Sequence, residues 1–204
     1  MRIPTLTAIE HATAVFQQAG GMLRTSEALA AGVEERTLYW MRDHGLIERR
    51  SRGVHHLVSM PLPAYPDIAA VFTRYPHAVL CLTSALSFHG VGTQLPGAVH
   101  IAVPSGTKAP RFAYPRVVRF TMNRAALDAG VEEHDMDGTT VPIFSVAKTV
   151  ADCFKFRNRI GFDVALEALQ DAVHSRKATP AQVMEFARID RVQNIVRPYL
   201  EALQ

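Results

Sequence analysis

Residues 25–58 read TSEALAAGVEERTLYWMRDHGLIERRSRGVHHLV, and the order of signals in this stretch decides the fold of the N-terminal part. A short helix capped by Thr25 is predicted over residues 25–31. Gly32 follows it, and because glycine adopts positive φ readily, the chain can reverse sharply there. A second helix is predicted over residues 34–44 and ends at a glycine. Two short helices joined by a tight turn are typical of a helix-turn-helix.

The end of the same stretch predicts a β-hairpin with a positively charged tip. Two short strands are predicted over residues 47–49 and 54–58. The tip and its approach carry Arg49, Arg50 and Arg52. A helix-turn-helix followed directly by a hairpin is a winged helix, and its second helix is expected to lie in the major groove of DNA. We therefore predict duplex DNA as the partner, with the three arginines contacting its backbone or its minor groove.

The outward face of the second helix supplies the other candidate contacts. Arg36 can bind a guanine edge or a phosphate, because its guanidinium presents paired donors. The hydroxyl groups of Thr37 and Tyr39 can donate to phosphate oxygens, which positions a protein without reading sequence. Trp40 is a further candidate, or it covers the edge of the core. Residues 1–60 carry seven arginines against six acidic residues, so a winged helix used for protein contacts is the alternative.

The length and composition narrow the class of protein. The chain has 204 residues, of which 48% are hydrophobic, and this excludes a disordered chain. Cys81 and Cys153 lie far apart and outside any Cys-x-x-Cys motif, so we expect reduced thiols and neither a disulfide framework nor a zinc site. No apolar stretch approaches the roughly 18 residues of a membrane span. We therefore expect a cytoplasmic protein without membrane contact, metal or cofactor.

A second basic stretch lies in the middle of the chain. Residues 68–127 contain no aspartate or glutamate. The basic residues of this stretch are Arg74, Lys108, Arg111, Arg116, Arg119 and Arg124. We interpret the four from Lys108 to Arg119 as additional phosphate contacts, because an acid-free basic stretch attracts a polyanion. In the alternative interpretation, the arginines neutralise the acidic residues between 132 and 137.

The sequence predicts an α+β protein of two domains. Residues 1–60 are expected to form the winged helix-turn-helix DNA-binding domain, beginning with a helix over residues 5–18. Residues 61–66 are proline-rich and are predicted to be a linker. Residues 67–204 are predicted to form a mixed α/β domain with a small sheet and a helical C-terminus. This domain has predicted helices over residues 67–75 and 83–89, predicted strands over 99–103, 117–121 and 140–144, and further helices after residue 145.

Three patterns favour an enzyme, and each has a simpler explanation. Asp135 and Asp137 form a D-x-D pair that could hold a divalent cation, but Asp137 and Gly138 together are also a strong hairpin-turn signal. Residues 84–89 contain serine and histidine but lack a nucleophile elbow. Residues 104–108 lack the spacing of a phosphate-binding loop. We therefore predict a non-enzymatic protein, with a nucleic-acid- or nucleotide-processing enzyme acting through Asp135 and Asp137 as the alternative.

Three stretches, taken in order, resemble AbiEi-family antitoxins. Residues 32–58, GVEERTLYWMRDHGLIERRSRGVHHLV, resemble the short winged helix that opens these proteins. Residues 77–106, HAVLCLTSALSFHGVGTQLPGAVHIAVPSG, resemble the family's Ser-Ala-Leu-x-x-His-Gly helix and the strand after it. Residues 141–173, VPIFSVAKTVADCFKFRNRIGFDVALEALQDAV, resemble its Thr-x-x-Asp helix and the helix that follows. The resemblance covers residues 6–203, which is nearly the whole chain.

The resemblance implies a transcriptional regulator that is the antitoxin of a type IV toxin–antitoxin system. Such a protein joins an N-terminal winged helix to a C-terminal antitoxin domain and represses its own operon at operator repeats. It counteracts a nucleotidyltransferase-like toxin without binding it tightly. The family's recognition-helix and wing positions correspond here to Arg36, Thr37, Tyr39, Trp40, Arg49, Arg50 and Arg52. An orphan regulator without a toxin is the alternative.

One position departs from the family pattern. Glu34 occupies the place of a helix-capping serine, and with Glu35 it puts two carboxylates near incoming phosphates. We expect this pair to weaken the affinity for the DNA backbone, so most of the positive charge must come from the wing and the second domain. Four further residues match family motif positions and are interpreted as structural: Ser84, His89, Thr149 and Asp152.

Overall fold

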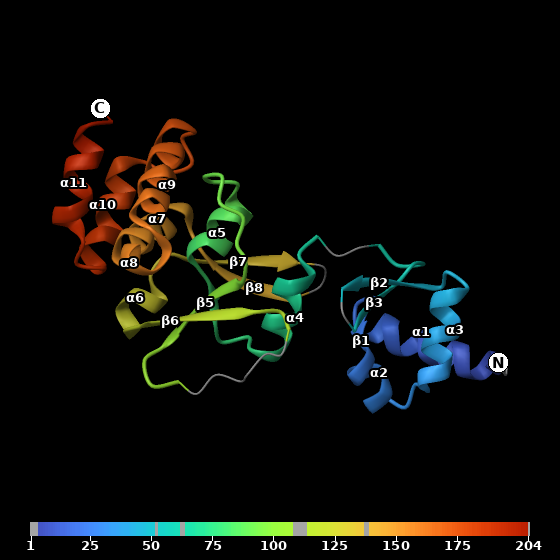
Figure 1. Cartoon of the computed structure of the whole chain (residues 1–204). Coiled ribbons are helices and arrows are strands. Elements are labelled where there is room, and N and C mark those ends of the chain that lie inside the picture. Colours follow the sequence, from blue (N-terminus) through green and yellow to red (C-terminus); the bar gives the residue numbers. More distant parts are fainter. Residues whose placement is uncertain (1–3, 52, 62–63, 108–113, 137–138, 204) are drawn as a thin grey trace. The chain divides into compact units, whose positions relative to one another are not determined.

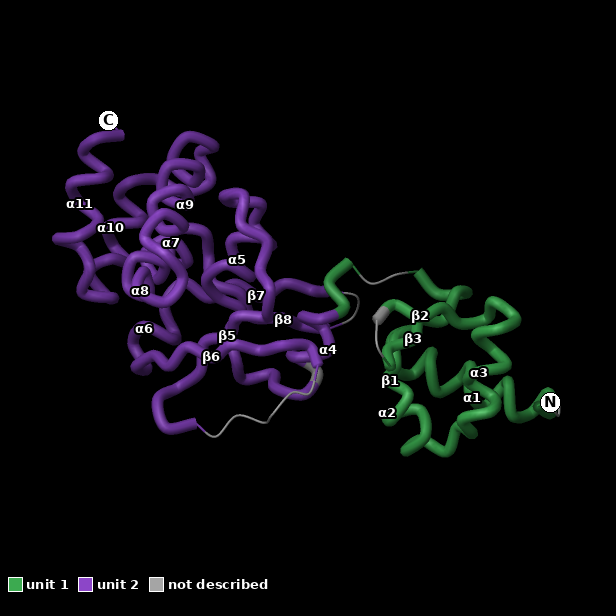
Figure 2. The backbone as a smooth tube through the Cα atoms, viewed as in Figure 1, with its two compact units in different colours: residues 1–66 green, residues 67–204 purple. Residues whose placement is uncertain are grey.

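The computed structural model describes residues 4–51, 53–61, 64–107, 114–136 and 139–203. The chain divides into two compact units, the first of residues 1–66 and the second of residues 67–204 (Figure 2). The proline-rich segment falls at the end of the first unit. Both units combine helices with a small sheet, which confirms the predicted α+β class (Figure 1).

The first unit contains three helices and three strands in its described residues. They are α1 Leu6–Gln18, β1 Met22–Arg24, α2 Thr25–Ala30, α3 Glu35–Asp43, β2 Ile47–Ser51 and β3 Val54–Leu57. The strands form one antiparallel sheet in the order β1-β3-β2. The helix-turn-helix α2–α3 and the hairpin β2–β3 therefore follow one another as the sequence predicts. The sequence does not predict β1, which is three residues long and pairs with β3.

Apolar side chains from the helices and the sheet build the core of the first unit. Phe16 of α1 is fully buried, and so is Met41 of α3. Leu38, three residues before Met41, and Ile47 of β2 belong to the same cluster. The spacing of Leu38 and Met41 therefore correctly predicts the buried face of α3. This face fixes α3 in the unit and leaves its opposite side for other contacts.

The start of α2 differs from the prediction. Thr25 is the first residue of the helix rather than its cap, because Arg24 occupies the cap position. The backbone N–H of Arg24 donates to the Glu27 carboxylate at 3.1 Å, which satisfies a donor that the helix itself leaves unpaired. The Thr25 hydroxyl instead lies 3.2 Å from Nε2 of His55 on β3. Thr25 therefore joins the helix-turn-helix to the hairpin.

The second unit contains a mixed five-stranded sheet and the remaining helices of the described chain. Its elements are α4 Pro66–Arg74, β4 Val79–Leu80, α5 Leu82–His89, β5 Val99–Pro104, β6 Val117–Met122, α6 Arg124–Asp128, β7 Val131–Met136, β8 Thr139–Phe144, α7 Val146–Lys155, α8 Arg157–Ile160, α9 Phe162–His174, α10 Pro180–Ile189 and α11 Gln193–Glu201. The strand order is β6-β5-β4-β8-β7. Neighbours β5/β6 and β4/β8 are parallel, and β4/β5 and β7/β8 are antiparallel. The predicted strands correspond to β5, β6 and β8.

The acidic residues of 131–136 form a strand that the sequence does not predict. This segment is β7, which pairs with β8 so that Glu133 lies opposite Pro142. Because β7 is at the edge of the sheet, its charged side chains reach solvent, and such charges discourage pairing with another strand. The turn predicted at residues 137 and 138 lies outside the described residues.

Helix α7 occupies the centre of the second unit. Every residue from Ala147 to Phe154 is buried, and the helix contacts α5, α9 and α10. The Ser145 hydroxyl caps it by accepting from the backbone N–H of Lys148 at 3.4 Å. Figure 1 shows α7 to α11 gathered at one end of this unit. None of the helices in the described part of the chain is long and apolar enough to cross a membrane.

Candidate nucleic-acid interface

The exposed side of α3 begins with an ion pair. The guanidinium of Arg36 contacts the Glu34 carboxylate, and the two side chains are 57% and 55% accessible. An ion pair so open to water contributes less than about 1 kcal/mol. Arg36 can therefore leave Glu34 for a base edge or a phosphate at small cost. The glutamate that departs from the family pattern thus acts directly on the predicted recognition arginine.

Tyr39 lies one turn further along the same side of α3. It is 41% exposed, and its hydroxyl donates to Oε1 of Glu35 at 3.0 Å. This hydrogen bond raises the pKa of Tyr39. The guanidinium of Arg42 lies 5.0 Å from the centre of the tyrosine ring. The Glu35 carboxylate therefore orients the Tyr39 hydroxyl. A DNA phosphate would have to replace this carboxylate as the acceptor of the hydrogen bond.

Trp40 lies at the edge of the core rather than fully in solvent. It is partly buried and packs against the core of the first unit. Its ring is stacked on the His44 ring, with the ring centres 3.8 Å apart and the planes 20° from parallel. Nδ1 of His44 donates to the Trp40 carbonyl at 2.8 Å, which fixes this stack at the end of α3. The geometry agrees with the interpretation that Trp40 covers the core edge.

The prediction for Thr37 is wrong. Its side chain is only 1% exposed, and its hydroxyl oxygen is buried. Thr37 precedes Met41 by four residues, which places both on the same face of the helix. A hydroxyl inside the core cannot donate to a phosphate. Thr37 is therefore a core residue of α3, and we remove it from the candidate contacts.

The hairpin β2–β3 carries exposed arginines on β2 and two buried histidines on β3. Arg49 and Arg50 are exposed on β2, and Nη1 of Arg50 donates to Oε1 of Glu48 at 3.0 Å. His55 and His56 of β3 are buried, and His55 is the cross-strand partner of Arg49. Burial lowers the pKa of His55, and the nearby charges of arginines lower it further. Arg52, the third predicted wing residue, lies outside the described residues.

Two basic residues of the acid-free stretch lie at one edge of the sheet of the second unit. Arg116 and Arg119 are exposed, and both belong to the β6 end of the strand order. Arg124 follows on α6 and pairs with Asp128 at 2.5 Å. Lys108 and Arg111 lie outside the described residues. The edge therefore holds two of the four phosphate contacts predicted for this unit.

Sequence patterns do not single out Arg159 of α8, which lies beside β6. Its Nη2 donates to the carbonyl of Arg119 at 3.2 Å, and its guanidinium lies 4.0 Å from the centre of the Phe120 ring. Burial lowers the pKa of His100 to about 4, and the charges of Arg159 and Arg116 add to this effect. Arg116, Arg119 and Arg159 thus form one basic cluster, which we call the β6 edge cluster. The basic run from residue 155 to 159 is the signal that could have pointed to it.

The interpretation that these arginines neutralise the acidic residues 132–136 is wrong. Strands β6 and β7 are the two opposite edges of the sheet, with β5, β4 and β8 between them. Four strand spacings separate them by roughly 19 Å. Arg116 and Arg119 therefore lie at the opposite edge of the sheet from Glu132, Glu133 and Asp135.

Residues that match the family motifs in the second unit hold its elements together. Nε2 of His89 donates to the Phe144 carbonyl at 2.8 Å, and the Thr149 hydroxyl donates to the same carbonyl at 3.1 Å. The Ser84 hydroxyl donates to the Ala98 carbonyl at 3.2 Å and accepts from the backbone N–H of residue 100 at 2.9 Å. These bonds tie α5 and α7 to the ends of β5 and β8. They support the structural interpretation.

Asp152 belongs to a buried ionic network between α7 and α10. The Lys148 ammonium, fully buried, contacts the Asp152 carboxylate and lies 3.0 Å from Oδ2 of Asp190. Lys155 donates to the other oxygen of Asp190 at 2.8 Å. Burial raises the pKa of Asp152 well above its usual value. Burial also acts on Asp190, but Lys148 and the hydrogen bonds around it lower the pKa of Asp190 overall.

The predicted divalent-cation pair is described only at Asp135, because Asp137 lies outside the described residues. Asp135 is exposed on β7. Among the residues that the structure describes, histidine, cysteine, aspartate and glutamate do not gather in a group of three that could hold a metal ion. Cys81 and Cys153 are buried free thiols, and burial raises the pKa of each.

The family comparison falls on the first unit. Residues 12–54 match the family model described as "Transcriptional regulator, AbiEi antitoxin". The match covers 43 of the 204 residues, so this part of the chain is similar to AbiEi-family regulators. The matched residues run from α1 through the helix-turn-helix to the start of β3, so the AbiEi match covers the elements that carry Arg36, Tyr39, Arg49 and Arg50.

Solved structures and curated proteins give two further comparisons. The crystal structure of the RV2827C protein from Mycobacterium tuberculosis is similar at 16% sequence identity, with a TM-score of 0.49, over 100% of this chain and 83% of that chain. No curated protein matches the chain significantly.

Proposed function

We propose that this chain is a DNA-binding transcriptional regulator of the AbiEi type, which contacts its operator through α3 and the β2–β3 hairpin. The observation that carries the proposal is the match to a transcriptional regulator model across the helix-turn-helix and the hairpin. In this interpretation Arg36 leaves Glu34 to reach a base edge. Arg49, Arg50 and Arg52 contact phosphates or the minor groove, and Tyr39 and Trp40 border the contact.

The first unit alone carries little excess positive charge. Glu34 and Glu35 lie at the start of α3. Their negative charges interact favourably with the helix dipole but repel the phosphates of DNA. We propose that the second unit contributes Lys108, Arg111, Arg116 and Arg119, and that Arg159 completes the β6 edge cluster. The cluster's position on an edge strand supports this proposal, because an edge is open to a partner.

We further propose that the regulator is an antitoxin, which represses its own operon at operator repeats and counteracts a nucleotidyltransferase-like toxin without tight binding. The similarity of residues 12–54 to AbiEi antitoxins supports this role. Co-expression with the product of a neighbouring nucleotidyltransferase-like gene tests it. Restored growth is expected, and growth arrest that persists at equal expression would leave an orphan regulator.

The wing contacts are tested by the salt dependence of DNA binding. We expect the triple variant Arg49→Ala, Arg50→Ala, Arg52→Ala to bind a duplex from the operon's upstream region more weakly. Each arginine that no longer neutralises a phosphate should reduce the slope of log K against log salt by about 0.9, so three such arginines give a fall of about 2.7. Arg197→Ala, an exposed arginine of α11, is the matched control and should leave the slope unchanged. An unchanged slope in the triple variant would remove the wing from the interface.

A further inference from the structure

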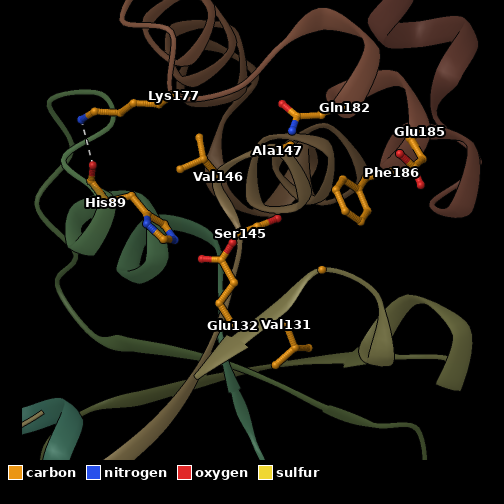
Figure 3. A pocket seen from close by; sticks show the side chains of 11 residues that line it. His89, Val131, Glu132, Ser145, Val146, Ala147, Lys177, Gln182, Glu185 and Phe186 are labelled. Carbon is orange, nitrogen blue, oxygen red and sulfur yellow. Dashed lines mark hydrogen bonds between the residues drawn. The ribbon is translucent and has the colours of Figure 1, made fainter. Parts of the chain in front are cut away.

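A pocket of about 660 Å³ opens within the second unit, on the side of α7 where that helix begins (Figure 3). Its walls come from the end of α5, the start of β7, the first turn of α7 and the first half of α10. The lining residues that the argument uses are His89, Val131, Glu132, Lys177, Glu185 and Phe186. This volume suits a ligand of the size of an amino acid or somewhat larger.

Two carboxylates line the pocket, and that of Glu132 also lies 3.5 Å from Nε2 of His134. Figure 3 shows the Glu132 side chain rising toward Ser145, with its carboxylate beside His89. Nε2 of His89 donates to a backbone carbonyl, so the neutral ring carries its acceptor lone pair on Nδ1. Burial lowers the pKa of His89, and the ring therefore stays neutral at physiological pH. Glu185 adds a second carboxylate to the lining.

The positive charge at the pocket is already engaged. The ammonium of Lys177 donates to the carbonyls of His89 and Gly90 at 2.9 and 2.6 Å. These carbonyls end α5, where a cation is favourable. Figure 3 shows the Lys177 side chain extended toward His89 at one side of the pocket. Two of the three ammonium hydrogens are thus used, whereas Glu132 and Glu185 leave a net negative charge.

Apolar groups form the rest of the wall and are held close by a glycine. The Phe186 ring and Val131 line the pocket beside the carboxylates, and an aromatic face attracts a cation. Gly130, with φ +66°, lies where an added Cβ would approach Cβ of Lys148 and the Phe186 ring to 2.9 Å. Glycine therefore lets the start of β7 approach α7 and α10 closely enough to build this wall.

We propose that this pocket binds a guanidinium or alkylammonium group, with Glu132 as the main carboxylate partner, Glu185 at the rim and Phe186 against the alkyl chain. A cation with several N–H donors matches two carboxylates and an acceptor nitrogen, and the apolar wall suits an aliphatic stem. The group belongs to a free small molecule or to an arginine or lysine side chain of a protein. The proposal is independent of DNA binding, because none of the lining residues belongs to α3, the hairpin or the β6 edge cluster.

Two probes distinguish the sources of such a cation. Agmatine carries a guanidinium on a free alkyl chain, and the peptide acetyl-Gly-Arg-Gly-amide carries it on a side chain. Titration of each into the isotope-labelled full-length chain, followed by amide NMR shifts, should perturb Gly130, Val131 and Val146. Binding of agmatine identifies a free ligand, and binding of the peptide alone identifies a side chain. Either result supports the proposal.

Matched glutamate variants test the named partners. Glu132→Gln should weaken binding of the active probe about tenfold, and Glu185→Gln should weaken it by a smaller factor. Glu133→Gln is the control, because this exposed residue is adjacent on β7 and its side chain points to the opposite face of the strand. It should change the affinity less than twofold. The NMR spectrum reports folding, and the Glu185 variant keeps the test valid if the Glu132 variant does not fold.

Three results would overturn the proposal. One is that neither probe gives saturable shifts at these residues at millimolar concentration. Another is that acetate binds at these residues and the two cations do not. The pocket would then be an anion site at the start of α7. The third is that Glu133→Gln weakens binding as much as Glu132→Gln, because the attraction would then be a general effect of surface charge.

Discussion

Replacing Lys148 by methionine is expected to destabilise the second unit strongly. The Lys148 side chain is fully buried and contacts two carboxylates, Asp152 and Asp190, which belong to different elements. Methionine has a similar length but no charge, so it preserves the packing and removes the cation. Removing one partner of a buried ion pair costs about 3–5 kcal/mol, because the remaining charge stays buried without compensation.

The structure places this cost at the lower end of the range. Asp190 keeps an ion pair with Lys155 at 2.8 Å, so it is still compensated. Asp152 is 0% exposed, and because burial already raises its pKa, it can take up a proton rather than remain charged. We therefore expect a decrease of about 3 kcal/mol in the free energy of unfolding.

Urea unfolding followed by two signals measures the effect and its location. The single tryptophan is Trp40 in the first unit, so its fluorescence reports that unit. Far-ultraviolet circular dichroism is dominated by helices of the second unit. With a slope of about 1–3 kcal/mol per molar urea, a decrease of about 3 kcal/mol lowers the dichroism midpoint by about 1–3 M. The fluorescence midpoint should stay unchanged.

Lys155→Met is the matched control for this prediction. Its side chain is 24% exposed and contacts only Asp190 within the network, so its removal should cost less than half as much. A Lys148→Met variant that is destabilised by less than about 1 kcal/mol at an unchanged slope would refute the reasoning. The network would then not hold α7 to α10.

Three further predictions follow from named contacts. Burial lowers the pKa of His100 from 6.5 to about 4, so between these pH values the unfolded chain binds a proton that the folded chain does not bind. The stability present above pH 6.5 should therefore decrease progressively toward pH 4. The urea midpoint of His100→Gln should depend less on pH over this range. Gly130→Ala should lower the free energy of unfolding by about 1–3 kcal/mol, because its Cβ would lie 2.9 Å from the Phe186 ring and the residue has positive φ. Thermal or urea unfolding measures this change. An unchanged midpoint would contradict the close approach of β7 to α10. Arg36→Ala should reduce the ratio of the affinities for operator DNA and unrelated DNA. An equal decrease in the affinity for both duplexes would mean that Arg36 contacts the DNA backbone and does not read bases.

Local patterns predict the first unit well, because its elements are specified by neighbours in the sequence. Two apolar residues at helical spacing fix the buried face of α3, and a glycine ends it. The same rule, applied more fully, also places Thr37 inside, since it precedes Met41 by four residues and shares its face. β1 escapes prediction, because a strand of three residues has no periodicity and exists only through its pairing with β3.

In the second unit, the missing information is long-range. β7 carries consecutive acidic residues, which suggest a turn, yet an edge strand tolerates them because their side chains reach water. β4 has two residues and is a strand because β5 and β8 lie on either side. The position of Arg159 beside Arg119 depends on the docking of α8 against β6, across forty residues of chain. The pocket likewise combines residues from 89 to 186, whose spacing in the sequence gives no signal.

Recognition of operator DNA by this chain is tested most directly by a specificity ratio. The measurement is the affinity of the full-length chain for a duplex from upstream of its own operon and for a scrambled duplex of equal length and composition, at one fixed physiological salt concentration. A sequence-specific regulator should prefer the upstream duplex by a factor of about 10³ or more. Equal affinity for the two duplexes, or no measurable binding of either, would contradict the account.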